Sequence, residues 1–226
     1  MKILFLFLMI GYGFAAKAQK PKSNPYGLKV IAYTDYLDSC KKSSNYQLLE
    51  LKKHIPGIVL DIRYATTNNF MKRVMYQQAR AFARKPVVVQ LKKVQALLNK
   101  KGYGLKIFDA YRPYSITVAF YKEASDKNFV ANPKKGSRHN RGCAVDLTLI
   151  DLKTGKAIEM PTAYDSFAPE AAVTYNKLPA HVIKNRTLLI STMQQFGFRV
   201  LENEWWHFDF IHWQQYDLMD IPFQRL

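Results

Sequence analysis

The stretch Ser137-Arg-His-Asn-Arg-Gly-Cys-Ala-Val-Asp-Leu-Thr-Leu-Ile150 determines the fold and chemistry expected of this chain. Its end, from Val145, alternates apolar and polar residues, which is typical of a β-strand with one buried face. His139 and Asp146 are seven positions apart, an odd offset that would place them on opposite faces of one continuous strand. A turn must therefore separate them, and Gly142 tolerates the backbone angles of a tight turn.

A second segment, Glu204-Trp-Trp-His207, repeats the pairing of a histidine with a carboxylate. We expect Glu204 in the loop that enters a strand and His207 within that strand. If this strand lies antiparallel to the first, His139, Asp146 and His207 converge. Two imidazoles and one carboxylate can hold Zn²⁺ with a position left for water, and Glu204 can act as a base beside them. These residues predict a zinc hydrolase with one Zn²⁺ per chain.

Other residues near these segments have simpler interpretations. The chain has five histidines, and the remaining three lack a neighbouring carboxylate of this kind, so we expect structural or surface roles for His54, His181 and His212. Trp205 and Trp206 are expected in the core or the pocket wall.

The remaining pattern indicates an α+β fold, a single domain whose central, mostly antiparallel sheet carries the zinc site and is flanked by helices. Arg112 lies at a junction between a strand and a helix, where side chains commonly face a cleft. We expect strands at 58–64, 105–110, 145–150, 157–160 and 205–211, a hairpin turn at 151–155, and helices at 87–101, 114–124 and 185–196.

Three regions divide the 226 residues. Residues 1–18 have the charged, apolar and small-residue order of a cleavable signal peptide, which predicts export, and we expect a periplasmic location. Residues 19–44 form a basic lead-in, and residues 45–226 form the catalytic domain. After cleavage no stable membrane insertion is expected.

Lys and Arg outnumber Asp and Glu by 34 to 17, giving a net charge of +17. This excess favours an anionic cell envelope. Nucleic acid is not an expected partner, because the basic residues are scattered and no recognition motif accompanies them. Two cysteines, Cys40 and Cys143, permit a disulfide in an oxidising compartment, but we expect two free or buried thiols.

Together these segments resemble the D-alanyl-D-alanine dipeptidases of the VanX family, which are zinc D,D-peptidases. The resemblance rests on Ser-x-His-x-x-Gly-x-Ala-x-Asp at 137–146, Glu-x-x-His at 204–207 and Asp-Ala-Tyr-Arg-Pro at 109–113. Arg63-Tyr-Ala-Thr66 with Asn69-Phe70 adds to it, and the likeness extends from about residue 45 to residue 215.

The resemblance implies a role for each site residue in hydrolysis of D-Ala-D-Ala to two D-alanines. His139, Asp146 and His207 would be the zinc ligands. Glu204 would be the general base, and Arg112 would stabilise the tetrahedral intermediate. Ser137 and Asp165 would bind the substrate amino group.

Several alternatives remain open. A D,D-carboxypeptidase acting on peptidoglycan stem peptides would use the same zinc chemistry. A non-catalytic wall-binding module would not need Glu204 or Arg112. Arg112 could instead form a salt bridge with Asp109, and Asp165 could form a turn. The sequence leaves the oligomeric state open, and other divalent ions suit the same ligands.

Overall fold

A five-stranded sheet forms the centre of the molecule, in the strand order β3-β5-β6-β8-β7. The computed structural model describes residues 24–124 and 126–226, so the predicted signal peptide lies outside the described residues. The strands are β1 Val30–Ile31, β2 Leu48–Glu50, β3 Val59–Leu60, β4 Phe82–Arg84, β5 Tyr103–Asp109, β6 Ala144–Asp151, β7 Phe198–Leu201, β8 Glu204–Phe210 and β9 Leu218–Met219. The helices are α1 Tyr33–Lys42, α2 Leu51–His54, α3 Lys85–Asn99, α4 Tyr114–Glu123 and α5 Ala180–Gln195, with short 3-10 helices between them.

The sheet is mixed, but most of its pairs are antiparallel. Only β3 and β5 run parallel, while β5-β6, β6-β8 and β7-β8 are antiparallel. Two small sheets accompany it, a parallel pair of β1 with β9 and an antiparallel pair of β2 with β4. The expected α+β class with a mostly antiparallel sheet is therefore confirmed.

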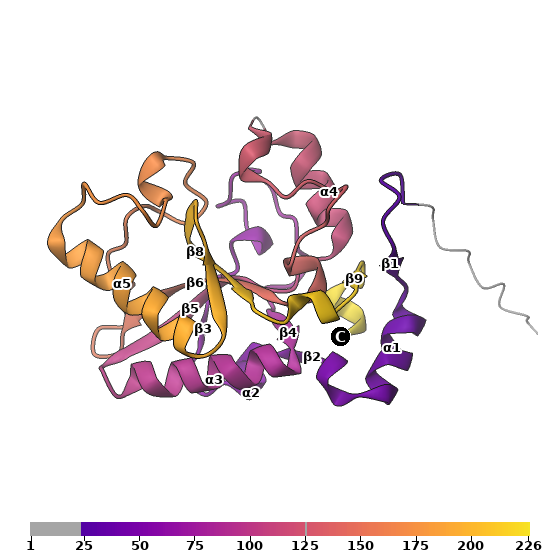
Figure 1. The fold of residues 1–226 in the computed structure, drawn as a ribbon, viewed down its shortest axis with the longest axis horizontal. Helices are drawn as coiled ribbons and strands as arrows, with labels where there is room; N and C mark the ends of the chain where they lie inside the picture. The colour runs from indigo at the N-terminus through magenta and orange to yellow at the C-terminus, as the bar shows by residue number, and fades with distance from the viewer. Residues whose placement is uncertain (1–23, 125) are drawn as a thin grey trace, which may run out of the picture.

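Helices α3 and α5 pack against each other and against β5 and β7 of the sheet, while α4 lies across the sheet from α3 (Figure 1). Pro86 occupies the first turn of α3, where the missing N–H costs nothing. The helix buries Val87, Leu91, Val94 and Leu98, whose spacing forms one apolar face. Helices α3 and α5 thus form a layer that packs against the sheet.

Two irregularities in the sheet bring functional side chains together. The register of β5 against β6 shifts after Ile107, so that Asp109 pairs directly with Asp146. On the other side, the register of β8 against β7 shifts so that Glu204 pairs with Leu201. Bulges of this kind redirect side chains near functional sites.

The structure corrects several expectations. The strand expected at 58–64 contains only β3, and a 3-10 helix at Arg63–Ala65 follows so that Tyr64 can enter the core. The return strand expected at 157–160 is a single bridge between Ile150 and Ala157, because the chain then leaves the sheet. Helix α5 begins five residues before the expected Asn185, directly after Pro179.

Residues 24–44, the described part of the segment before the expected catalytic domain, contain a strand and a helix. Residues 30–42, within the expected lead-in, form β1 and α1, and they contribute Ile31 and Tyr36 to the core. Strand β9 follows the strand expected to be last, and its pairing with β1 joins the two ends of the described chain (Figure 1).

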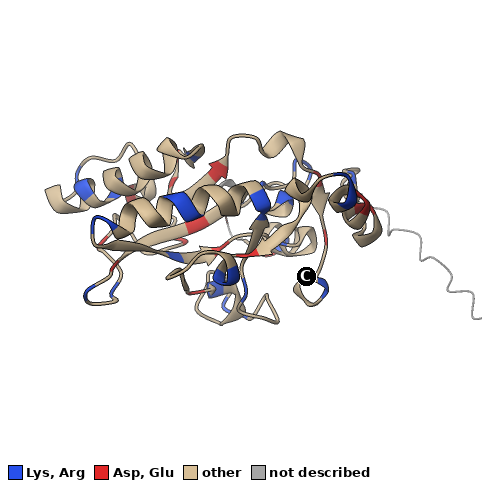
Figure 2. Ribbon diagram, turned by 90° about the horizontal axis from the view of Figure 1, so that it is seen from below, with Lys and Arg blue, Asp and Glu red and all other residues tan. Residues whose placement is uncertain are grey.

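Two further sequence expectations concern cysteines and charge. Cys40 and Cys143 are free, as expected, and Cys143 is fully buried. Lys and Arg occur on helices and loops around the molecule rather than in one stripe (Figure 2). None of the helices in the described residues is long and apolar enough to span a membrane.

Candidate active site

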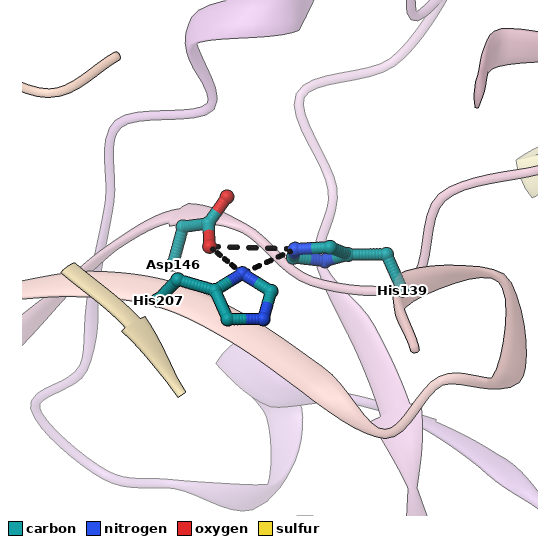
Figure 3. Close-up of side chains that lie close together, drawn as sticks. All are labelled: His139, Asp146 and His207. Atoms are coloured by element: carbon teal, nitrogen blue, oxygen red, sulfur yellow. Dashed lines mark hydrogen bonds and ion pairs between the residues drawn. The ribbon is translucent and has the colours of Figure 1, made fainter. Parts of the chain in front are cut away.

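The three expected metal ligands, His139, Asp146 and His207, lie close together, two of them on the inner strands β6 and β8 of the sheet (Figure 3). Asp146 on β6 and His207 on β8 are direct partners across the antiparallel pair, as the sequence predicted. His139 reaches them from a 3-10 helix at His139–Arg141, and Gly142 ends this helix with a left-handed φ of 70°. The turn predicted between His139 and Asp146 is therefore confirmed.

The three facing atoms are nearly equidistant. His139 Nε2 lies 3.2 Å from His207 Nδ1 and 3.3 Å from Asp146 Oδ1. His207 Nδ1 and Asp146 Oδ1 are 3.0 Å apart. Ligands at about 2.0–2.1 Å from one tetrahedral ion are separated by about 3.3 Å. The spacing of this trio fits such an ion.

Each of the three side chains is held from its outer side. His139 Nδ1 donates to the carbonyl of Ala110 at 2.7 Å, and His207 Nε2 lies 2.9 Å from Asp209 Oδ1. The Tyr164 hydroxyl donates to Asp146 Oδ2 at 2.9 Å. Outer-side partners of this kind orient metal ligands and increase their basicity.

The outer hydrogen bonds determine which ring nitrogen of each histidine carries a hydrogen and which has a free lone pair. Because a carbonyl and a carboxylate only accept, the outer nitrogens of His139 and His207 carry the hydrogens, and their inner nitrogens present lone pairs. Two lone pairs and the Asp146 oxygen then face one another, which requires a positive charge between them. The donor set therefore fits a divalent metal ion.

The close contacts in the trio shift the pKa values of Asp146 and His207 in opposite directions. Burial would raise the pKa of Asp146, but His139 and His207 hold it well below its usual range. Burial would lower the pKa of His207, but its hydrogen bonds to Asp146 and Asp209 raise it well above its usual value. The ionised form of Asp146 is thus strongly stabilised, and a metal ligand must be in this form.

Glu204 stands beside this trio at the start of β8. It was expected in the loop before the strand, but the register shift makes it the first strand residue. Its Oε2 lies 3.9 Å from His207 Nδ1. Burial raises its pKa, which makes it a better proton acceptor than an ordinary glutamate.

Arg112 lies between two carboxylates at the junction of β5 and α4. Its Nε and Nη2 atoms contact Asp109 Oδ2 at 2.9 and 2.7 Å, and Nη2 is 3.8 Å from Asp146 Oδ2. The guanidinium also stands over the rings of Tyr64 and Phe120, 5.3 and 4.8 Å from their centroids. The salt bridge considered as an alternative for Arg112 is present, and the same side chain still lines the cavity.

Ser137 and Asp165 approach the cavity from different loops. Ser137 Oγ accepts from the backbone of His139 at 3.2 Å, which ties it to the ligand loop. Asp165 has a left-handed φ of 60° and accepts a hydrogen bond from the Tyr64 hydroxyl at 2.9 Å. Burial raises the pKa of Asp165 well above its usual value, and the nearby Asp146 adds to the effect. A cationic ligand group would relieve that cost.

The cavity itself is small and has a wall of aromatic side chains. Its volume is about 180 Å³, and all seven residues singled out from the sequence line it. One part of the wall combines rings with short aliphatic groups, namely Tyr64, Phe70, Phe120, Phe129, Val130, Ala131, Phe167 and Leu201. A site of this size and chemistry suits a small polar molecule with short apolar side chains.

Sequence reasoning missed several residues that support the site. Tyr164 adjoins Asp165 in sequence, and Asp209 follows His207 by two positions on the same strand face, so both were within reach of a pattern argument. Tyr76, which donates to Asp109 at 2.8 Å, carried no such signal.

The residues expected to have structural roles also have clear places. Trp205 and Trp206 are buried in the core. His181 pairs with Glu159 on the surface, and none of His54, His181 and His212 lines the cavity.

Comparisons with known proteins show which family the sequence matches. The sequence profile of a family described as D-ala-D-ala dipeptidase matches residues 44–224. A D-alanyl-D-alanine dipeptidase of Escherichia coli K12 is 30% identical over 181 residues, covering 80% of this chain and 93% of the relative. D-alanyl-D-alanine dipeptidases of Enterococcus faecalis and Enterococcus faecium are each 29% identical, covering 77% and 70% of this chain and 93% and 88% of the relatives.

Proposed function

The chain belongs to the D-Ala-D-Ala dipeptidase family and is a peptide hydrolase, and from this premise we propose that it is a zinc enzyme that cleaves D-Ala-D-Ala into two D-alanines. The observation that carries the proposal is the buried trio of His139, Asp146 and His207, whose inner atoms converge at 3.0–3.3 Å beside Glu204. Bound zinc would polarise the peptide carbonyl and make water more acidic.

The substrate ammonium is assigned to Asp165 and Ser137. Asp165 supplies the opposite charge in a half-buried position, and Tyr64 fixes its orientation. Ser137 Oγ accepts a hydrogen bond from the ammonium. An N-acylated peptide has no such charge and would leave Asp165 unpaired, which is how the site would prefer a free dipeptide to a longer chain.

Glu204 takes the proton from the attacking water and returns it to the leaving amine. Its raised pKa supports both halves of this exchange, because a strongly acidic carboxyl would accept the proton poorly. Its Oε2 lies 3.9 Å from His207 Nδ1, so the carboxylate is next to the proposed metal position.

Arg112 stabilises the negative charge that develops on the carbonyl oxygen. The guanidinium stays cationic, and burial makes its hydrogen bonds more effective than they would be in water. Asp109 holds it in place before the reaction, so little reorganisation is needed when the charge appears.

The test uses two substrates and two variants. The zinc-loaded protein is incubated with free D-Ala-D-Ala and with its N-acetyl derivative, and released D-alanine is measured. Glu204→Ala should abolish cleavage, while the matched control Glu202→Ala, two positions away on the exposed β7–β8 turn, should retain it. Removal of the metal with a chelator should abolish activity, and zinc should restore it.

Each other outcome has a definite meaning. Efficient cleavage of the N-acetyl form would make the protein a D,D-carboxypeptidase. Cleavage of neither form would contradict the proposed function and favour a wall-binding module.

We also propose that the protein is exported to the periplasm and recovers D-alanine from wall turnover there. The support is the order of charged, apolar and small residues at 1–18, which lie outside the described structure. Fractionation of cells should find the processed protein in the periplasmic extract, and its recovery uncleaved in the cytoplasm would contradict this part of the proposal.

A further inference from the structure

A free dipeptide carries a carboxylate as well as an ammonium, and the assignments above leave the carboxylate without a partner. Three acidic residues line the cavity, Asp146, Asp165 and Glu204. An anionic substrate end would meet strong repulsion there unless a cation faced it. In the described part of the chain, Arg112 and Arg138 are the lysine or arginine residues that line the cavity.

Arg112 is already committed to other groups. Both its Nε and its Nη2 contact Asp109, and Nη2 also faces Asp146. Its charge is therefore shared between two buried carboxylates, and its proposed task is at the carbonyl oxygen. Its remaining donors are assigned to that oxygen, so the substrate carboxylate needs another cation.

Arg138 has donors to spare. Its Nε lies 3.4 Å from Asp209 Oδ2, and its guanidinium stands over the Trp213 ring, 4.8 Å from the centroid. Within residues 24–124 and 126–226, its two terminal nitrogens make no hydrogen bond, and the side chain is 44% exposed. Stacking on an aromatic ring leaves the edge of a guanidinium free for a carboxylate.

Arg138 lies between the cavity and a neighbouring groove. It precedes the ligand His139, and together with Leu201 it lines both the cavity and the neighbouring groove along β7 and β8. Asp165, in contrast, is held by Tyr64 from the 3-10 helix after β3. The two candidate charges are thus anchored by different elements of the cavity wall.

We infer that Arg138 binds the C-terminal carboxylate of the substrate and makes the enzyme select dipeptides with a free acid. The inference rests on the proposed function. Arg138 at the carboxylate and Asp165 at the ammonium would bind both ends of the dipeptide. A chain extended at either end would therefore lose one ion pair.

The test compares D-Ala-D-Ala with D-Ala-D-alaninamide, in which the carboxylate is replaced by a neutral group. The wild-type protein should have a KM for the amide about tenfold to a hundredfold above that for the acid, the range of a lost charged hydrogen bond. Arg138→Met should raise the KM for the acid by a similar factor, with a smaller change in kcat. It should leave the KM for the amide nearly unchanged, and Arg138→Lys should recover part of the preference.

Two controls separate recognition from structural damage. Arg199→Met removes an exposed cation that lines only the neighbouring groove, and it should leave both KM values unchanged. Because Arg138 contacts Asp209, which bonds His207, zinc affinity and Tm are measured for every variant. Both should stay close to wild type in Arg138→Met.

The outcomes are distinct. An unchanged preference for the acid in Arg138→Met would overturn the inference while leaving the proposed function intact. Equal loss on acid and amide together with weaker zinc binding would also overturn it, because Arg138 would then act through Asp209. Failure of the wild-type protein to cleave either compound would overturn the proposed function and this inference with it.

Discussion

Removing the hydroxyl of Tyr164 tests whether the trio of His139, Asp146 and His207 is a metal site. This hydroxyl donates to Asp146 Oδ2 at 2.9 Å, while the ring stacks on Phe108 with centroids 4.5 Å apart. Tyr164→Phe keeps the ring and deletes only the hydrogen bond. A hydrogen bond to a charged group contributes about 1.5–3 kcal/mol, which corresponds to a factor of about ten to a hundred in an equilibrium constant. Loss of an outer-side partner lowers metal affinity by a similar factor.

The assay is competition for zinc between the protein and a chromophoric chelator, which needs no catalytic activity. Tyr164→Phe should bind zinc about tenfold to a hundredfold more weakly than the wild-type protein. The matched control is Tyr64→Phe, which deletes the hydrogen bond to Asp165 instead and should keep zinc affinity while raising the KM for the dipeptide. Equal zinc affinity in wild type and Tyr164→Phe, or equal losses in both variants, would refute the reasoning.

Three other predictions address catalysis, packing and pH. Glu204→Gln should lower kcat by roughly 10²–10⁴-fold while zinc binding by chelator competition stays near wild type, and a small loss of activity would remove Glu204 as the base. Gly142→Ala should lower the free energy of unfolding, measured in urea, by more than about 1 kcal/mol. The φ of Gly142 is 70°, and a Cβ there would lie 2.6 Å from a Leu48 methyl group. Unchanged stability would show that alanine causes no strain in this turn. Hydrogen bonds from Arg80, together with Lys53, lower the pKa of Glu50 from its ordinary 4.5 to about 2, so this carboxylate stabilises the fold above pH 4.5, and the contribution is lost as pH falls towards 2. The stability advantage over Glu50→Gln, about 1 kcal/mol for a surface pair, should accordingly vanish near pH 2, and a difference that persists there would contradict the linkage.

The trio of His139, Asp146 and His207 was predictable because its geometry depends on local rules. Strand periodicity fixes the side on which each residue lies, and an odd offset with a glycine between the two residues requires a turn. Those rules placed His139 against Asp146, and the antiparallel pairing of β6 with β8 then brought His207 opposite Asp146. Helix α3 was predictable for the same reason, since its apolar spacing is regular.

The misplaced elements depend on contacts that no local pattern contains. The segment after Ala157 leaves the sheet, and it carries Tyr164 over Phe108 and onto Asp146. Glu204 was assigned to a loop because the register shift against Leu201 is a property of the strand pair and not of either sequence. Long-range pairing thus decided what propensity left open.

The salt bridge of Arg112 and its proposed catalytic role are compatible in the structure. Asp109 is fixed by Tyr76 and by the backbone of Ala110, and it in turn fixes Nε and Nη2 of Arg112. A guanidinium has five donors in one plane, and in the described part of the chain Nη1 makes no hydrogen bond. The salt bridge therefore uses one edge of the group and holds the rest of it in the cavity. A buried arginine that is held on one side and left with free donors on the other is suited to stabilising charge that appears only during the reaction.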